Sequence, residues 1–96
     1  MTDVVVTDVP DALRFEARTP GGDLVGTAAY ERRGDDVVLT HTVVEPAAEG
    51  HGIGSALVRQ ALDQLRAAGA RVVPQCAFVR AFVAEHPEYR DMVIDH

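Results

Sequence analysis

Residues 40–57, THTVVEPAAEGHGIGSAL, combine three structural signals in succession. The β-branched and apolar residues up to Val44 are typical of the end of a strand. Pro46 interrupts this strand, and a long helical pattern begins at Gly52. A glycine-rich turn between a strand and a helix is a favourable place for an anion, because the first N–H groups of a helix have no partner within it. The glycines at positions 50, 52 and 54 leave room for a phosphate to reach these groups.

The sequence of this loop does not match either of two common nucleotide-binding motifs. The dinucleotide-binding motif requires G-x-G-x-x-G, whereas this chain has G-x-G-x-G. The Walker P-loop requires a lysine, and the chain contains none. The alternative to an anion site is a tight strand-to-helix turn that needs glycine only for its geometry.

Composition limits the kind of protein that this chain can form. Its 96 residues are enough for one domain, which we expect to include residues 1–96, and 47% hydrophobic content is ordinary for a folded protein. A net charge of −6 argues against nucleic acid or a membrane surface as a partner. The single cysteine excludes an intramolecular disulfide, and the acidic N-terminus resembles neither a signal peptide nor a membrane span. We therefore expect a cytoplasmic protein.

The pattern of apolar residues predicts an α+β domain. A short edge strand is expected at 4–6. Three strands at 13–18, 24–32 and 37–44 should form an antiparallel meander, since short turns join them. One broad apolar face predicts a helix over 53–68, followed by a strand at 70–73 that should lie parallel to the strand before the helix. A second helix is predicted at 76–85, and a short helical turn near 87. The result is a mixed, mostly antiparallel sheet with a central strand–loop–helix unit and two main helices.

Several short motifs occur in order along the chain. They are a phenylalanine in the first long strand, H-T-x-V, G-x-G-I-G, P-x-C and H-P-E-Y. In this sequence they are Phe15, His41 to Val44, Gly50 to Gly54, Pro74 to Cys76, and His86 to Tyr89. In this order they resemble the small members of the GNAT N-acetyltransferase superfamily, and the resemblance extends from about residue 13 to residue 93.

The resemblance implies a truncated GNAT fold that binds acetyl-CoA, or coenzyme A, as co-substrate. It implies that the loop amides hold the pyrophosphate and that the strand at 37–44 pairs with the pantetheine arm. The cofactor-binding residues would then be Val43, Val44, Glu49, Gly50, His51, Gly52, Ile53, Gly54 and Ser55. Position 49, usually glutamine or arginine in this family, is a glutamate here, and a carboxylate beside a pyrophosphate should weaken binding unless it points to solvent.

Two further residues are candidates for catalysis. Cys76 follows Pro74 at a predicted helix N-terminus, which favours the thiolate, so this thiol would accept the acetyl group or protonate the leaving thiolate. Alternatively, Cys76 is a small residue packed between a strand and a helix. His41 would accept a proton from an amine, or would support the sheet through a hydrogen bond. The spacing of histidines and the cysteine predicts no metal site.

Together these features predict an N-acetyltransferase that moves an acetyl group from acetyl-CoA to the amine of a small molecule or a protein. The alternative is a non-catalytic module that binds coenzyme A or a partner on the same fold. The absence of lysine means that no internal lysine amine can accept the group.

Overall fold

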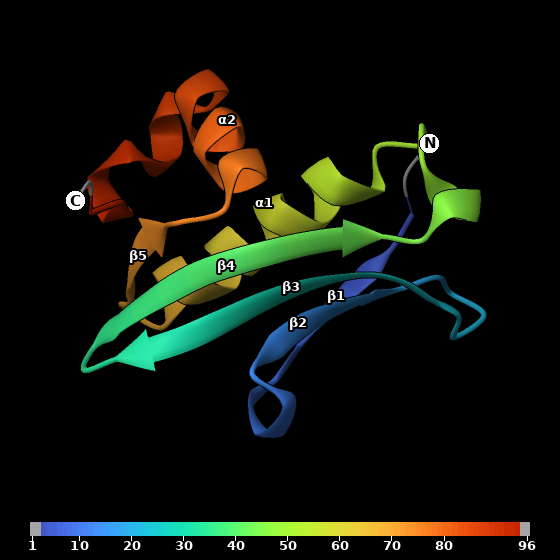
Figure 1. Ribbon diagram of the computed structural model, residues 1–96, viewed down its shortest axis with the longest axis horizontal. Helices are drawn as coiled ribbons and strands as arrows, with labels where there is room; N and C mark the ends of the chain where they lie inside the picture. The colour runs from blue at the N-terminus through green and yellow to red at the C-terminus, as the bar shows by residue number, and fades with distance from the viewer. Residues whose placement is uncertain (1–2, 95–96) are drawn as a thin grey trace.

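The computed structural model describes residues 3–94, and its centre is a five-stranded sheet in the order β1-β2-β3-β4-β5. The first four strands pair antiparallel, and β5 pairs parallel with β4 (Figure 1). This arrangement confirms the predicted meander and the crossover through the helix. The strands are β1 Val5–Val9, β2 Arg14–Arg18, β3 Leu24–Arg33, β4 Asp36–Val44 and β5 Arg71–Pro74.

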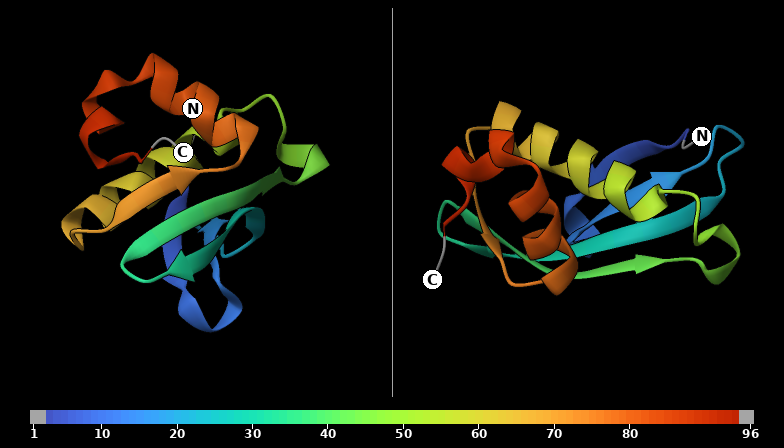
Figure 2. Two further views of the ribbon diagram at one scale, coloured as in Figure 1. Left: turned by 60° about the vertical axis from the view of Figure 1, so that its left-hand side comes forward. Right: turned by 90° about the horizontal axis from the view of Figure 1, so that it is seen from above.

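Two α-helices and three short 3-10 helices complete the described fold. Helix α1 (Ile53–Ala67) connects β4 to β5 and lies across one face of the sheet, and α2 (Ala77–Glu85) follows β5 (Figures 1 and 2). The 3-10 helices are η1 (Pro10–Ala12), η2 (Pro46–Ala48) and η3 (Pro87–Met92). Within residues 3–94, no helix is long and apolar enough to cross a membrane.

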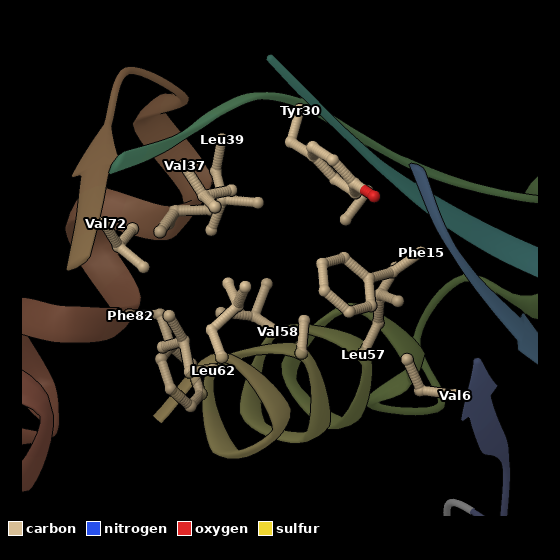
Figure 3. Close-up of a cluster of buried hydrophobic side chains, with 14 of the residues drawn as sticks. Val6, Phe15, Tyr30, Val37, Leu39, Leu57, Val58, Leu62, Val72 and Phe82 are labelled. Carbon is tan, nitrogen blue, oxygen red and sulfur yellow. The ribbon is translucent and has the colours of Figure 1, made fainter. Parts of the chain in front are cut away.

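The core lies between α1 and the sheet. Leu57, Val58 and Leu62 point from α1 toward aromatic and aliphatic side chains of β2, β3 and β4, and Phe82 of α2 lies beside them (Figure 3). The buried face of α1 agrees with the apolar face predicted for a helix over 53–68 as far as Leu65, whereas the last apolar residue of that range, Ala68, is exposed at the C-cap. The buried residues of α1 are Ile53, Leu57, Val58, Ala61, Leu62 and Leu65.

Strand β2 differs from the expected alternation at two residues. In a strand over 13–18, alternation would place Leu13 on the same face as Phe15, but Leu13 precedes the strand in a left-handed conformation with φ 53° and is 46% exposed. Glu16 is buried because Arg14 and Arg18 both donate hydrogen bonds to its carboxylate, at 2.7 and 3.0 Å. These bonds hold the pKa of Glu16 below its usual value.

The H-P-E-Y motif joins the C-terminal part of the described chain to α1. The hydroxyl of Tyr89 donates to Asp63 at 2.7 Å and accepts from Arg59 at 3.1 Å. His86, at the C-cap of α2, stacks on Phe82 with 3.9 Å between ring centroids. The motif therefore fixes α2 and η3 against α1, and its side chains contribute to packing.

Candidate functional site

Strands β4 and β5 separate half-way along β4. They pair from Asp36 with Arg71 as far as Leu39 with Pro74, and the last hydrogen bond runs from Cys76 N to Leu39 O at 2.9 Å. Thr40 is an extra residue in β4, since Ala29 pairs with His41 while Tyr30 pairs with Leu39. Such a bulge bends the strand and increases its twist. As a result, one edge of β4 beyond the bulge has no neighbouring strand.

The backbone groups that face this open edge can be assigned from the register of β3 and β4. Glu45 N donates to Val25 O at 2.9 Å, so Glu45 faces β3. Since successive residues of a strand face opposite directions, Val43 also faces β3, where it pairs with Thr27. The N–H and C=O groups of Thr42 and Val44 therefore face the open edge.

The N-terminus of α1 opens into a hollow of about 230 Å³ beside this edge. No side chain caps the helix, and its first turn contains no acidic residue, so its leading N–H groups are open to an anion. Gly50 and Gly52 have φ values of 84° and 74°, a region that side chains other than glycine rarely adopt. The hollow is lined by Val44, Ala48, Glu49, Gly50, Gly52, Ile53, Gly54, Ser55 and Phe78.

Ala48 and Phe78 are the two residues of this hollow that were not predicted to bind the cofactor, and Phe78 is the larger of them. The helical spacing of α2 predicted it as part of the apolar face, but its side chain is 42% exposed. Its ring lies so close to Gly54 that a Cβ at that position would be 2.9 Å from the ring. Phe78 thus forms the wall of the hollow on the α2 side, and Gly54 is needed for this close approach.

Cys76 lies where β4 and β5 separate. It is the N-cap of α2, and its sulfur is 3.5 Å from the hydroxyl oxygen of Thr42. Burial raises the pKa of the Cys76 thiol, but the Thr42 hydroxyl and the backbone N–H groups of Val79 and Phe78 favour the thiolate and lower the pKa overall. The thiol is partly exposed. Cys76 therefore has both the access and the electrostatic environment of a reactive cysteine.

We predict that iodoacetamide alkylates Cys76 readily near neutral pH. Because the thiolate is the reacting form, the rate should be half-maximal at a pH below about 8.5, the value for a free cysteine. Thr42→Val should move this pH upward, since it removes the hydroxyl beside the sulfur, whereas Thr42→Ser should not. Rates can be followed by intact-protein mass spectrometry. A half-maximal pH at or above that of free cysteine would contradict the assignment.

The remaining predicted site residues occupy different places. His41 is exposed on β4, on the opposite face from Thr42, and its imidazole has no hydrogen bond among those of residues 3–94. Val43 is 59% exposed, with its backbone turned to β3. His51 is exposed in the loop and does not line the hollow. No group of histidine, cysteine or carboxylate side chains in residues 3–94 could hold a metal ion.

Glu49 lines the hollow and has an exposed side chain. If its carboxylate faces a bound pyrophosphate, Glu49→Gln should tighten coenzyme A binding by about 1 kcal/mol, as expected for a partly exposed contact between like charges. Isothermal calorimetry at low ionic strength would measure the change. Unchanged affinity would mean that Glu49 points into solvent.

The site thus consists of a strand with one open edge next to an uncapped helix N-terminus, and the sequence of the chain was compared with known protein families. A model of the GCN5-related N-acetyltransferase family matches residues 14–92. The chain belongs to this family. Members of the GNAT family use acetyl-CoA as the acetyl donor. No curated protein sequence matches the chain.

Solved structures with the same fold include both small and larger GNAT proteins. A GCN5-like protein from Staphylococcus aureus aligns with all of this GNAT chain and 93% of its own, with a TM-score of 0.72 and 15% identity. The ribosomal-protein-S18-alanine N-acetyltransferase of Escherichia coli has a TM-score of 0.60 and 22% identity over 76% of this chain. A GNAT acetyltransferase from Brucella melitensis, crystallised with acetyl-CoA, has a TM-score of 0.56 and 31% identity over 76% of this chain. This chain spans only 50% and 54% of the last two proteins.

Proposed function

We propose that this chain binds acetyl-CoA along the open edge of β4 and transfers the acetyl group to an amine. One observation carries the proposal: the hollow at the α1 N-terminus is lined by Val44, whose backbone groups face the open edge of β4. Val44 lines the hollow and is two residues from Thr42, and Phe78 lines it and is two residues from Cys76. Thr42 and Cys76 are in contact with each other. A ligand that placed its phosphates in the hollow would therefore extend toward the Cys76 sulfur.

The residues present fit this co-substrate. The open N–H groups of the first turn of α1 would hold the pyrophosphate, since three glycines of the lining leave space for it to approach them. The outward-facing C=O of Thr42 and the N–H and C=O groups of Val44 would pair with the amides of the pantetheine arm. The register of β4 supports Val44 over Val43 as the residue whose N–H faces this arm.

Acetyl-CoA supplies an acetyl group already activated as a thioester. The chain would contribute the outward-facing N–H of Thr42 toward the developing oxyanion, because Thr42 lies beside Cys76 and such fixed donors stabilise negative charge. The Cys76 thiol would donate its proton to the coenzyme A thiolate as the C–S bond breaks, and solvent would reprotonate the Cys76 thiolate afterwards. His41 is exposed on the same strand, where an imidazole would take a proton from the acceptor amine directly or through one water.

Two observations bear on the acceptor. The E. coli relative is an N-acetyltransferase for the alanine of a ribosomal protein, which shows that this fold can serve a protein amine in that case. The present chain spans half of that enzyme, so the identity of its acceptor is not carried over from it. We infer a primary amine of a small molecule or a protein as the acceptor class.

Transfer is tested by incubating the protein with acetyl-CoA and a panel of amines, with peptide N-termini and small polyamines among them. Release of free coenzyme A should depend on the amine and exceed the rate of hydrolysis without it. Binding of acetyl-CoA with no amine-dependent release from any member of the panel would instead identify a non-catalytic coenzyme A-binding module.

A further inference from the structure

A second hollow, of about 340 Å³, is formed by residues of α2, the end of β5, η3 and the residue that follows η3. It shares no lining residue with the hollow at the α1 N-terminus. A parallel bridge between Val72 and Val93 and a hydrogen bond from Ile94 N to Val72 O at 2.7 Å fix its far wall. It is lined by Pro74, Arg80, Val83, Ala84, Arg90 and Val93.

The charge of this hollow is opposite to that of the chain. The sequence has fifteen acidic and nine basic residues, all nine being arginine. Seven of these arginines are engaged elsewhere, either in ion pairs with carboxylates or, for Arg32, over the ring of Tyr30. Within residues 3–94, Arg80 and Arg90 alone have neither kind of partner, and both line this hollow, which contains no carboxylate. Two unneutralised guanidinium groups in an acidic protein indicate a place for an external anion.

The two arginines also differ in how firmly they are held. Nη1 of Arg80 donates to the carbonyl oxygens of Pro74 and Gln75, at 3.3 and 2.7 Å, and its other nitrogens have no described hydrogen bond. Arg90 is exposed and has no described side-chain hydrogen bond. Arg80 is therefore held in position with further N–H groups available to a ligand, and the side chain of Arg90 can move to contact a ligand. A guanidinium group matches a carboxylate with two parallel hydrogen bonds.

We propose that this hollow binds a small organic carboxylate with an apolar body. The four other lining residues are apolar and would contact the body of the ligand, while the arginines bind its carboxylate. A carboxylate is favoured over a phosphate monoester because of the cost of desolvation. A mostly apolar wall excludes water, and desolvating the single negative charge of a carboxylate costs less than desolvating the nearly doubled charge of a phosphate. The volume is within the range of small-molecule sites.

The test is an amide NMR titration of the whole protein with phenylacetate, using phenylacetamide as the neutral match and phenyl phosphate as the competing anion. Phenylacetate should give saturable shifts at the amides of Arg80, Ala84 and Val93, with a Kd near or below about 1 mM, while the amides of residues 50–55 stay unchanged. Phenylacetamide should bind at least about tenfold more weakly, since it lacks the charge.

Variants separate this site from general surface charge. Arg90→Gln should weaken phenylacetate binding at least about fivefold, and Arg80→Gln should do the same. Arg33→Gln removes the same charge at the β3–β4 hairpin, where Arg33 pairs with Glu31, and should change the affinity less than about twofold. Equal binding of phenylacetamide, tighter binding of phenyl phosphate, or equal effects of Arg90→Gln and Arg33→Gln would each overturn the proposal.

Discussion

Replacing Ser55 with aspartate is expected to weaken acetyl-CoA binding by about 2 kcal/mol, roughly thirtyfold, while leaving the unliganded protein as stable or slightly more stable. Ser55 is exposed in the first turn of α1 and lines the hollow at the helix N-terminus. A carboxylate there would interact favourably with the helix dipole, by about 0.3–1 kcal/mol. The same charge would repel a pyrophosphate. The substitution should thus raise the stability of the unliganded protein while it lowers the affinity for acetyl-CoA, so a loss of folding cannot be mistaken for a loss of binding.

Ser55→Asn is the matched control, because it has nearly the same shape as aspartate without the charge. Its affinity for acetyl-CoA should stay within about threefold of the original. Thermal unfolding with and without acetyl-CoA, together with calorimetry, measures both effects. If Ser55→Asp and Ser55→Asn bound acetyl-CoA equally well, the pyrophosphate would not lie at the α1 N-terminus.

Replacing Cys76 with alanine is expected to lower the rate of acetyl transfer by about a hundredfold, the lower end of the effect of a positioned proton donor. The affinity for acetyl-CoA should change little, since backbone groups supply most of the proposed contacts. Cys76 is partly exposed, so the cavity left behind should cost less than about 1 kcal/mol of unfolding free energy. Steady-state kinetics and urea unfolding measure the two quantities separately.

Cys76→Ser distinguishes proton transfer from packing, because serine keeps the size of the side chain but is a much weaker acid than a thiol. It should be nearly as slow as Cys76→Ala. A thioester on Cys76, removable by hydroxylamine after incubation with acetyl-CoA, would instead assign the sulfur as an acetyl acceptor. Normal turnover by Cys76→Ala would mean that Cys76 is a packing residue and that transfer is direct.

The elements of the fold are predictable because their signals are local. Apolar and β-branched residues bounded by turns located β3 and β4, and the apolar face of α1 was correct from Ile53 to Leu65. Glycines 50, 52 and 54 marked the loop and the start of α1, where two of them have positive φ. The hollow contains seven of the nine residues expected to bind the cofactor.

The features missed by sequence analysis depend on contacts between distant residues. The bulge at Thr40 has no proline or glycine to signal it, yet it turns Thr42 and Val44 toward the face that Val37 and Leu39 occupy before it. Phe78 fits a helical apolar face, so only the tertiary packing of α2 beside Gly54 shows that it lines the hollow. The burial of Glu16 depends on its two arginine neighbours, which alternation alone does not reveal.

The most direct test of acetyl-CoA binding along β4 is amide hydrogen exchange at two neighbouring residues. The N–H of Val43 is in the ladder with β3 and should exchange slowly with or without ligand. The N–H of Val44 faces the open edge and should exchange rapidly in the free protein. Saturating acetyl-CoA should slow Val44 by about tenfold or more and leave Val43 unchanged. If Val44 exchanged at the same rate in the free and saturated protein, acetyl-CoA would not pair with this strand, and the proposed binding mode would be wrong.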